Sequence, residues 1–170
     1  MRIMNSDLGQ CFIRSIQAVL SRLGVVANFA APPLLRVALA LPFFRSGLTR
    51  WDGFLTISPG TLYLFENQFQ LHIIGGAYHF PAPDIVAFVT ALFEISLPVL
   101  LLIGFATRFT ALALLVMTGV IQLVFPDGWV NFHLYWASLA VAIIALGAGP
   151  LSLDRLINIC LRPSHREKMI

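Results

Sequence analysis

Four apolar stretches recur along the chain, with lengths typical of helices that cross a membrane. They cover residues 33–48, 83–103, 108–125 and 130–146. A helix rises about 1.5 Å per residue, so roughly 17 to 25 apolar residues span a hydrocarbon core about 30 Å thick. The pattern therefore predicts an all-α integral membrane protein, a bundle of four spanning helices.

Proline and glycine mark the expected ends of these helices. Pro32-Pro33 precedes the first stretch, Thr107 is the expected N-cap of the third, and Pro126-Asp127-Gly128 is a turn signal after it. The run from Gly147 to Pro150 stops the fourth. The turns are short, except for the long outer loop 51–82 between the first and second spans. We expect this loop to fold over the outer mouth of the bundle.

Inside the long loop, Ser58 and Pro59 have the residue types that begin a helix, and Gly75-Gly76 is expected to break that helix. This pattern predicts a short helix at the membrane interface.

Both flanks of the bundle have amphipathic patterns that favour interfacial helices. In segment 1–31 apolar side chains recur at helical spacing: Phe12, Ile16, Val19, Leu20 and Leu23. This segment lacks the cleavage pattern of a signal peptide. Near the other end, Ser152 is an expected cap for a helix with Leu153, Leu156, Ile157 and Cys160 on one face. We therefore expect a single membrane domain over 1–170, with a core at 33–156 and a basic tail at 157–170.

Composition supports the membrane assignment, since 58% of residues are hydrophobic and only 11% are charged. A soluble chain with this composition would expose large apolar patches. The same figures exclude a disordered chain. The chain has 11 Lys and Arg against 8 Asp and Glu, and this net charge of +3 is too small for a nucleic-acid-binding surface. The bilayer is the expected partner.

The distribution of basic residues predicts the orientation. Eight of the 11 lie on one side if both termini share it, whereas the opposite loops hold only Arg50. Basic residues concentrate on the cytoplasmic side of membrane proteins. We therefore expect a multi-pass membrane protein with both termini in the cytoplasm.

Three ionisable residues lie within the predicted spans, namely Arg36, Arg45 and Glu94. Charges at such positions are costly and usually have partners. From their depths we predict that Glu94 pairs with Arg45 or Arg36, although Arg36 is also close enough to the interface to snorkel. Two interpretations remain open: an ion pair that fixes helix packing, and a polar site for a ligand or a proton.

The outer mouth gathers further candidates for a ligand site or ion pair: Arg50, Asp52, Glu66, Gln122, Trp129, His133 and Trp136. Its tryptophans also fit an aromatic belt at headgroup depth. His72, His79, His133 and Glu66 match no standard ligand spacing, so no metal site is predicted. Cys11 and Cys160 are far apart, and without a Cys-x-x-Cys pair the chain does not fit a dithiol oxidoreductase. No nucleophile or phosphate-loop motif assigns an enzymatic reaction.

The order of several motifs resembles the DoxX family of small four-span bacterial membrane proteins over roughly residues 33–156. The matching segments are Leu34-Leu35-Arg36, the stretch from Ser46 to Asp52, the stretch from Thr61 to Glu66, Ala91-Leu92-Phe93-Glu94, the turn from Gly104 to Arg108, Pro126-Asp127-Gly128-Trp129 with His133 and Trp136, and the stretch from Gly147 to Asp154. One departure is Arg50, where many members carry lysine. The resemblance implies a location in the bacterial inner membrane. It also implies association with membrane oxidoreductase or oxidative-stress systems, with quinone as an acceptor in one case.

Three functional hypotheses follow. The first is a subunit of a membrane oxidoreductase system that binds quinone or a lipid-like ligand, with membrane or cytoplasmic redox proteins as partners. The second is a carrier that uses a buried Arg/Glu pair, and the third is a scaffold that recruits soluble proteins to the basic face. Small bundles of this kind also associate, so a homo-oligomer is a further expectation.

Overall fold

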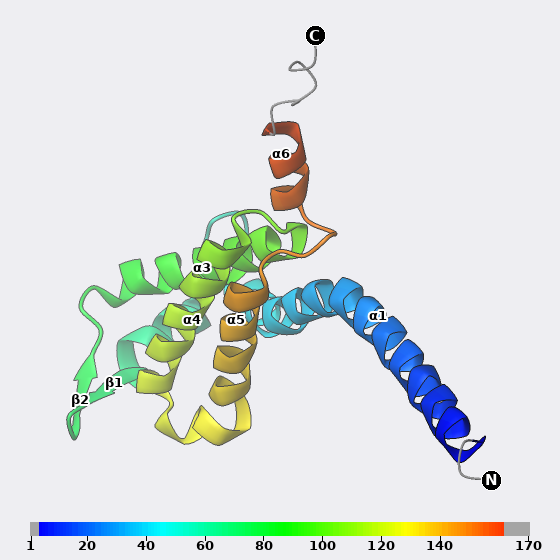
Figure 1. Cartoon of the computed structure of the whole chain (residues 1–170). Coiled ribbons are helices and arrows are strands. Elements are labelled where there is room, and N and C mark those ends of the chain that lie inside the picture. Colours follow the sequence, from blue (N-terminus) through cyan, green and yellow to red (C-terminus); the bar gives the residue numbers. More distant parts are fainter. Residues whose placement is uncertain (1–3, 162–170) are drawn as a thin grey trace.

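The structure is a computed structural model that describes residues 4–161, and it is an all-α membrane bundle (Figure 1). Its long helices are α1 (Met4–Leu48), α3 (Pro83–Ile103), α4 (Thr107–Val124) and α5 (Leu134–Leu146), the last continuous with a π-helical turn, η3 (Trp129–His133). Within these residues, four helical segments are long and apolar enough to cross a membrane: Ile16–Leu48, Pro83–Ile103, Thr107–Val124 and Pro126–Leu146. The predicted four-span architecture is confirmed.

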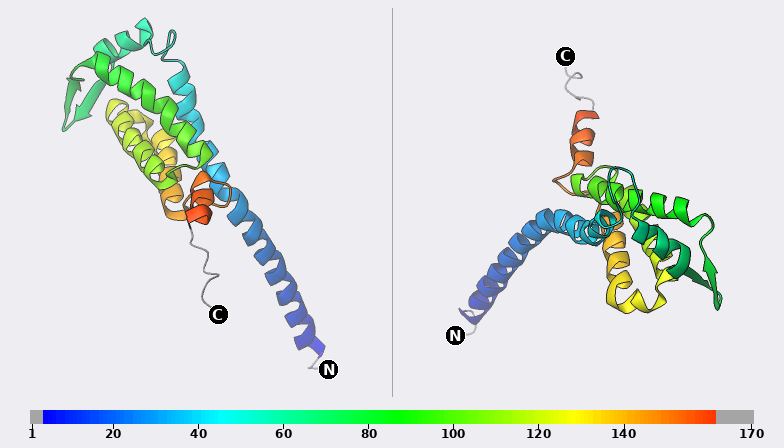
Figure 2. Two further views of the ribbon diagram at one scale, coloured as in Figure 1. Left: turned by 90° about the horizontal axis from the view of Figure 1, so that it is seen from above. Right: turned by 180° about the vertical axis from the view of Figure 1, so that it is seen from behind.

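The first helix is longer than expected. α1 runs for 45 residues through Pro32, Pro33 and Pro42, so the predicted break before residue 33 is wrong. A proline removes one backbone donor but fixes φ near a helical value, and membrane helices tolerate that loss. The amphipathic segment expected as a separate helix is thus the continuation of the first span, and it projects well beyond the other helices (Figure 2).

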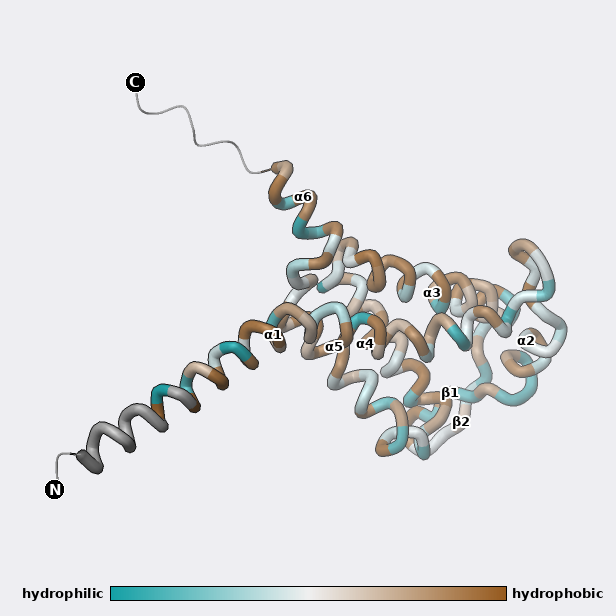
Figure 3. Tube along the Cα trace, turned by 90° about the vertical axis from the view of Figure 1, so that its right-hand side faces the viewer, coloured by the Kyte–Doolittle hydropathy of each residue, from teal (hydrophilic) through white to brown (hydrophobic). Residues whose placement is uncertain are grey.

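The bundle core is largely apolar, and hydrophobic residues predominate along the spanning helices (Figure 3). Each long helix contributes a fully buried side chain, namely Leu39, Leu101, Leu114 and Ile143, and alanines allow the helices to approach. α1 packs mainly against α3, and α4 mainly against α5. Large side chains such as Phe109 and Val116 remain exposed on the outside. This surface is suited to contact with lipid.

The long loop folds over one end of the bundle, which we call the hairpin end. It contains α2 (Pro59–Tyr63), a π-helical turn η1 (Leu64–Gln68), and an antiparallel hairpin of β1 (Gln70–Ile73) and β2 (Gly76–His79). The expected cap is present, since Ser58 Oγ accepts a hydrogen bond from the Thr61 amide at 3.2 Å. The hairpin itself was not predicted. It lies against α4, where His72 Nδ1 bonds to the Leu123 carbonyl oxygen at 3.1 Å.

The opposite end, which we call the α6 end, contains the last described helix, α6 (Leu153–Leu161). Ser152 caps it as predicted, accepting a hydrogen bond from the Arg155 amide at 3.2 Å. The expectation for Thr107 is wrong, because Thr107 is the first residue of α4 and not its cap. Asp154 supplies the cap instead: its carboxylate accepts from the Ala106 amide at 2.7 Å and from the Thr107 amide at 2.9 Å.

Candidate ligand-binding cavity

A cavity of about 550 Å³ lies at the hairpin end, between α1, α3, α4 and η3 and beneath η1. Most of its wall is aromatic or aliphatic, with the aromatic side chains Phe43, Phe65, Phe69, Phe80, Phe125, Phe132 and Trp136. The polar groups on the wall include Arg50, Glu94, Asp127 and His133. A mostly apolar pocket with a few convergent polar groups is the usual form of a small-molecule site.

The ion pair in this cavity joins Glu94 to Arg50. Arg50 is bidentate: its Nε donates to one carboxylate oxygen, and its Nη2 donates to the other at 2.9 Å. The Glu94 side chain is 2% exposed and that of Arg50 is 15% exposed. Bidentate geometry makes this one of the stronger kinds of ion pair. The predicted pairing of Glu94 with Arg45 or Arg36 is wrong.

The position of Gly47 explains why Arg50 is the partner. A Cβ at Gly47 would lie 2.9 Å from the backbone carbon of Glu94, so α1 and α3 cross in close contact there. Arg50 follows three residues later and faces the same side. Arg45 precedes Gly47 by two residues, which turns its side chain about 200° away, and it is exposed.

Arg36 shares the face of Gly47 but lies about three helical turns away, at the α6 end. It is buried there and does not snorkel to water. Its guanidinium donates to the carbonyl oxygens of Pro32, Leu102 and Leu151. Arg36 thus joins α1 to the end of α3 and to the segment before α6.

Two further contacts hold the Arg50 guanidinium inside the cavity. Its Cζ lies 5.4 Å from the centre of the Phe65 ring, a cation–π arrangement. Its Nη2 is 3.4 Å from Ser46 Oγ. Phe65 belongs to the loop, so the loop and the ion pair are parts of one assembly.

His133 is the second polar group, and its surroundings indicate which nitrogen of the neutral ring carries the hydrogen. Gln122 Nε2 donates to the Pro126 carbonyl oxygen at 2.9 Å, which turns Gln122 Oε1 toward His133 Nδ1. Nδ1 must therefore donate, and the neutral ring keeps Nε2 as an acceptor. Gly128 packs against this ring, because a Cβ at Gly128 would lie 2.5 Å from His133 Cε1.

Among the sequence candidates, Arg50, Glu94, His133 and Trp136 line the cavity, and Gln122 orients His133. Arg36, Arg45, Asp52, Glu66 and Trp129 do not line it. His72 and His79 make separate contacts on the hairpin, and within residues 4–161 no group of three His, Cys, Asp or Glu side chains has the geometry to hold a metal ion. Sequence reasoning missed the loop aromatics Phe65 and Phe69, although their spacing of four residues places them on one helical face.

These features define a small four-span membrane protein with a mostly apolar cavity, which contains a few polar groups, under the loop between its first two spans. The chain belongs to the DoxX family, whose model matches residues 31–127. It is also similar to an uncharacterized protein of Haemophilus influenzae, with 31% identity over 146 residues that cover 74% of this chain and 82% of the relative. No solved structure matches the chain significantly. The family match includes Arg50, Glu94 and Gln122, and it ends before His133.

Proposed function

We propose that the cavity binds a quinone or a similar lipid-soluble planar molecule, and that the protein is the ligand-binding component of a membrane oxidoreductase or oxidative-stress system. The observation that carries this proposal is that one aromatic cavity contains both a hydrogen-bond donor and a hydrogen-bond acceptor that a ligand could use. The donor is the Arg50 guanidinium and the acceptor is Nε2 of His133.

The two groups complement the two redox forms of such a ligand. Arg50 uses Nε and Nη2 for Glu94, which leaves Nη1 to donate to a quinone carbonyl oxygen. His133 Nε2 accepts a hydrogen bond from the hydroxyl of the reduced form, the quinol. Reduction of a quinone takes two electrons and two protons; in this proposal the electrons are exchanged with a partner redox protein and the protons with the aqueous phase. The apolar wall would hold the ring and the isoprenoid tail.

Binding can be tested with the fluorescence of a cavity residue. The variant Trp51→Phe/Trp129→Phe leaves Trp136 as the only tryptophan, and Trp136 lines the cavity. We expect a short-chain ubiquinone, added to the purified protein in detergent, to quench this fluorescence saturably. In the same background His133→Phe should weaken binding of the corresponding ubiquinol about 2- to 10-fold, the range for one lost hydrogen bond, and should leave binding of the quinone nearly unchanged.

Tyr135→Phe is the matched control, because Tyr135 is exposed and lies outside the cavity lining. It should bind the quinone and the quinol with unchanged affinity. Quenching that rises linearly with quinone, with the same slope in all variants, would show simple partition into the micelle and would contradict the proposal.

We also propose that the α6 end faces the cytoplasm of a bacterial cell and that the membrane is the inner membrane. The basic residues Arg108 and Arg155 are exposed at this end, in keeping with the usual enrichment of cytoplasmic loops. Cys160 is a free, exposed thiol on α6. In a Cys11→Ser variant, a membrane-impermeant maleimide should label Cys160 in inverted vesicles and not in intact cells; the reverse pattern would contradict this orientation.

A further inference from the structure

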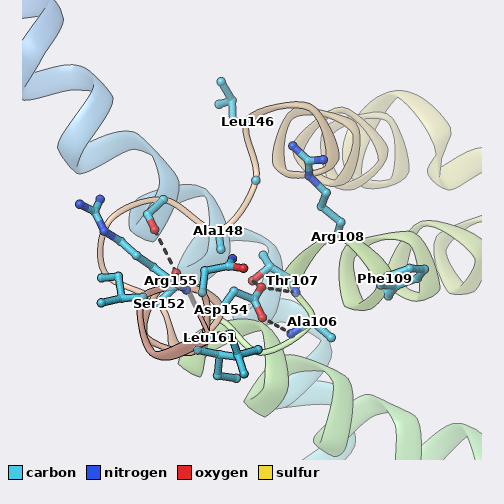
Figure 4. A pocket seen from close by; sticks show the side chains of 15 residues that line it. Ala106, Thr107, Arg108, Phe109, Leu146, Ala148, Ser152, Asp154, Arg155 and Leu161 are labelled. Carbon is cyan, nitrogen blue, oxygen red and sulfur yellow. Dashed lines mark hydrogen bonds between the residues drawn. The ribbon is translucent and has the colours of Figure 1, made fainter. Parts of the chain in front are cut away.

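A second hollow, of about 1000 Å³, lies at the α6 end and is open to the outside (Figure 4). It is bordered by the start of α4, the end of α5 and one side of α6. We call it the α6 groove. Its wall combines the apolar side chains Phe109, Leu146, Ile157 and Leu161 with the polar side chains Arg108, Asp154, Arg155 and Asn158.

The depth of the α6 groove corresponds to the boundary between hydrocarbon and headgroups. Arg108 and Phe109 are the second and third residues of one spanning helix, and Leu146 is the last residue of another. Phe109 is 78% exposed, and Leu146 is exposed as well. An exposed apolar surface that ends beside an arginine therefore lies at the level of lipid phosphates.

The electrostatics of the α6 groove favour an anion. Figure 4 shows Arg108 and Arg155 on opposite sides, with Asp154 between them. The Asp154 carboxylate is already used, since it accepts two amide hydrogen bonds at the start of α4 and one from the Thr107 hydroxyl at 2.8 Å. The Arg108 guanidinium lies beside Gly147, where a Cβ would be 3.5 Å from Nη2. Within the described residues, no protein hydrogen bond or ion pair occupies the Arg108 or Arg155 guanidinium.

We propose that the α6 groove binds the headgroup of an anionic phospholipid. Arg108 donates hydrogen bonds to the phosphate, Arg155 adds electrostatic attraction, and an acyl chain lies along Phe109 and Leu146. Basic pockets beside spanning helices recognise anionic headgroups by this combination of charge and apolar contact. The site is separate from the cavity at the hairpin end and does not depend on the function proposed for it.

Native mass spectrometry of the full-length protein tests the proposal. The protein is released from micelles that contain equal amounts of phosphatidylglycerol and phosphatidylcholine, and the retained lipid is counted. We expect phosphatidylglycerol to be retained about five-fold more than phosphatidylcholine. Arg108→Gln should remove most of this preference, because one basic residue at an anionic membrane surface contributes about five-fold in affinity, or about 1 kcal/mol.

Arg22→Gln is the matched control, since Arg22 is exposed on α1 and lies outside the α6 groove. It should keep the preference. If Arg108→Gln does not fold, Asn158→Asp adds a carboxylate to the wall at an exposed position and should lower retention by a similar factor.

Three outcomes would overturn the proposal. The first is equal retention of the two lipids, and the second is an equal loss in Arg108→Gln and Arg22→Gln. The third is full competition by millimolar glycerol 3-phosphate, which carries the same phosphate without acyl chains and would indicate a site for a soluble anion. We expect glycerol 3-phosphate to leave lipid retention unchanged.

Discussion

Removal of Arg50 should destabilise the bundle more than removal of Glu94. In Arg50→Gln the Glu94 carboxylate loses both of its arginine hydrogen bonds while it remains 2% exposed. Breaking a buried ion pair in this way costs about 3 to 5 kcal/mol, because an uncompensated charge is left behind. In Glu94→Gln the arginine is 15% exposed and keeps Phe65 and Ser46 as neighbours, so we expect a loss of about 1.5 to 3 kcal/mol.

The double variant separates the ion pair from other effects. Arg50→Gln/Glu94→Gln has neither charge, so it should be more stable than Arg50→Gln alone. This order requires the interaction energy of the double-mutant cycle to exceed the loss in Glu94→Gln alone, so we expect about 3 kcal/mol, the upper end of the usual range for residues in contact. Free energies of unfolding would be measured from reversible denaturation in mixed detergent micelles, followed by circular dichroism.

Arg45→Gln is the control for loss of an arginine from the same helix, because Arg45 is exposed and makes no described ion pair. It should change the free energy of unfolding by less than about 0.5 kcal/mol, as surface substitutions usually do. If the two single losses at positions 50 and 94 added to the loss of the double variant within about 0.5 kcal/mol, the ion pair would not stabilise the fold and the reasoning would be refuted.

Three further predictions concern single contacts. Gly47→Ala should destabilise the bundle by about 1 to 3 kcal/mol in the same denaturation assay, because its Cβ would lie 2.8 Å from a side-chain carbon of α3. Gly24→Ala is the control: its Cβ would meet nothing within 4 Å, so this substitution should be neutral or stabilising. Gly128→Ala should displace the His133 ring, seen as a changed imidazole NMR signal; an unchanged signal would contradict the packing described. Burial raises the pKa of Asp154, but hydrogen bonds from Thr107 and Ala106 and the nearby Arg36 charge outweigh this and lower it below 3.8. The stability that this carboxylate contributes is therefore complete well above pH 3.8 and is lost as pH falls through the lowered pKa. In Asp154→Asn, the free energy of unfolding should fall less steeply with decreasing pH in this acidic range than it does in the unchanged protein.

The spanning helices were predictable because their signal is local. An apolar run of sufficient length has few alternatives to a membrane helix, and residues 83–103 match α3 (Pro83–Ile103) at both ends. The continuity of α1 through Pro32 was not predictable in this way, because proline both begins helices and occurs within membrane helices. Ser58 and Ser152 were found as caps since a capping serine lies next to the helix that it caps.

The site was predictable only in part, because it depends on contacts between distant residues. Glu94 was recognised as a charge that needs a partner, but the choice of Arg50 depends on where α1 crosses α3, and Gly47 fixes that crossing. Gln122 and His133 were both expected at the outer mouth, and the structure joins them by a hydrogen bond. The cap that Asp154 gives to α4 has no local signal at all.

The cap from Asp154 has a consequence for the order in which the chain assembles. Synthesis proceeds from the N-terminus, and the Ala106 amide is made 48 residues before the carboxylate that binds it. The Leu151 carbonyl oxygen accepts a hydrogen bond from Arg36, and it is made 115 residues after that arginine. While the last span is being inserted, the first turn of α4 and the Arg36 guanidinium therefore lack these native partners. A nascent chain stalled before residue 151 should be sensitive to proteases at the 104–107 turn, and that sensitivity should disappear once residue 154 has emerged.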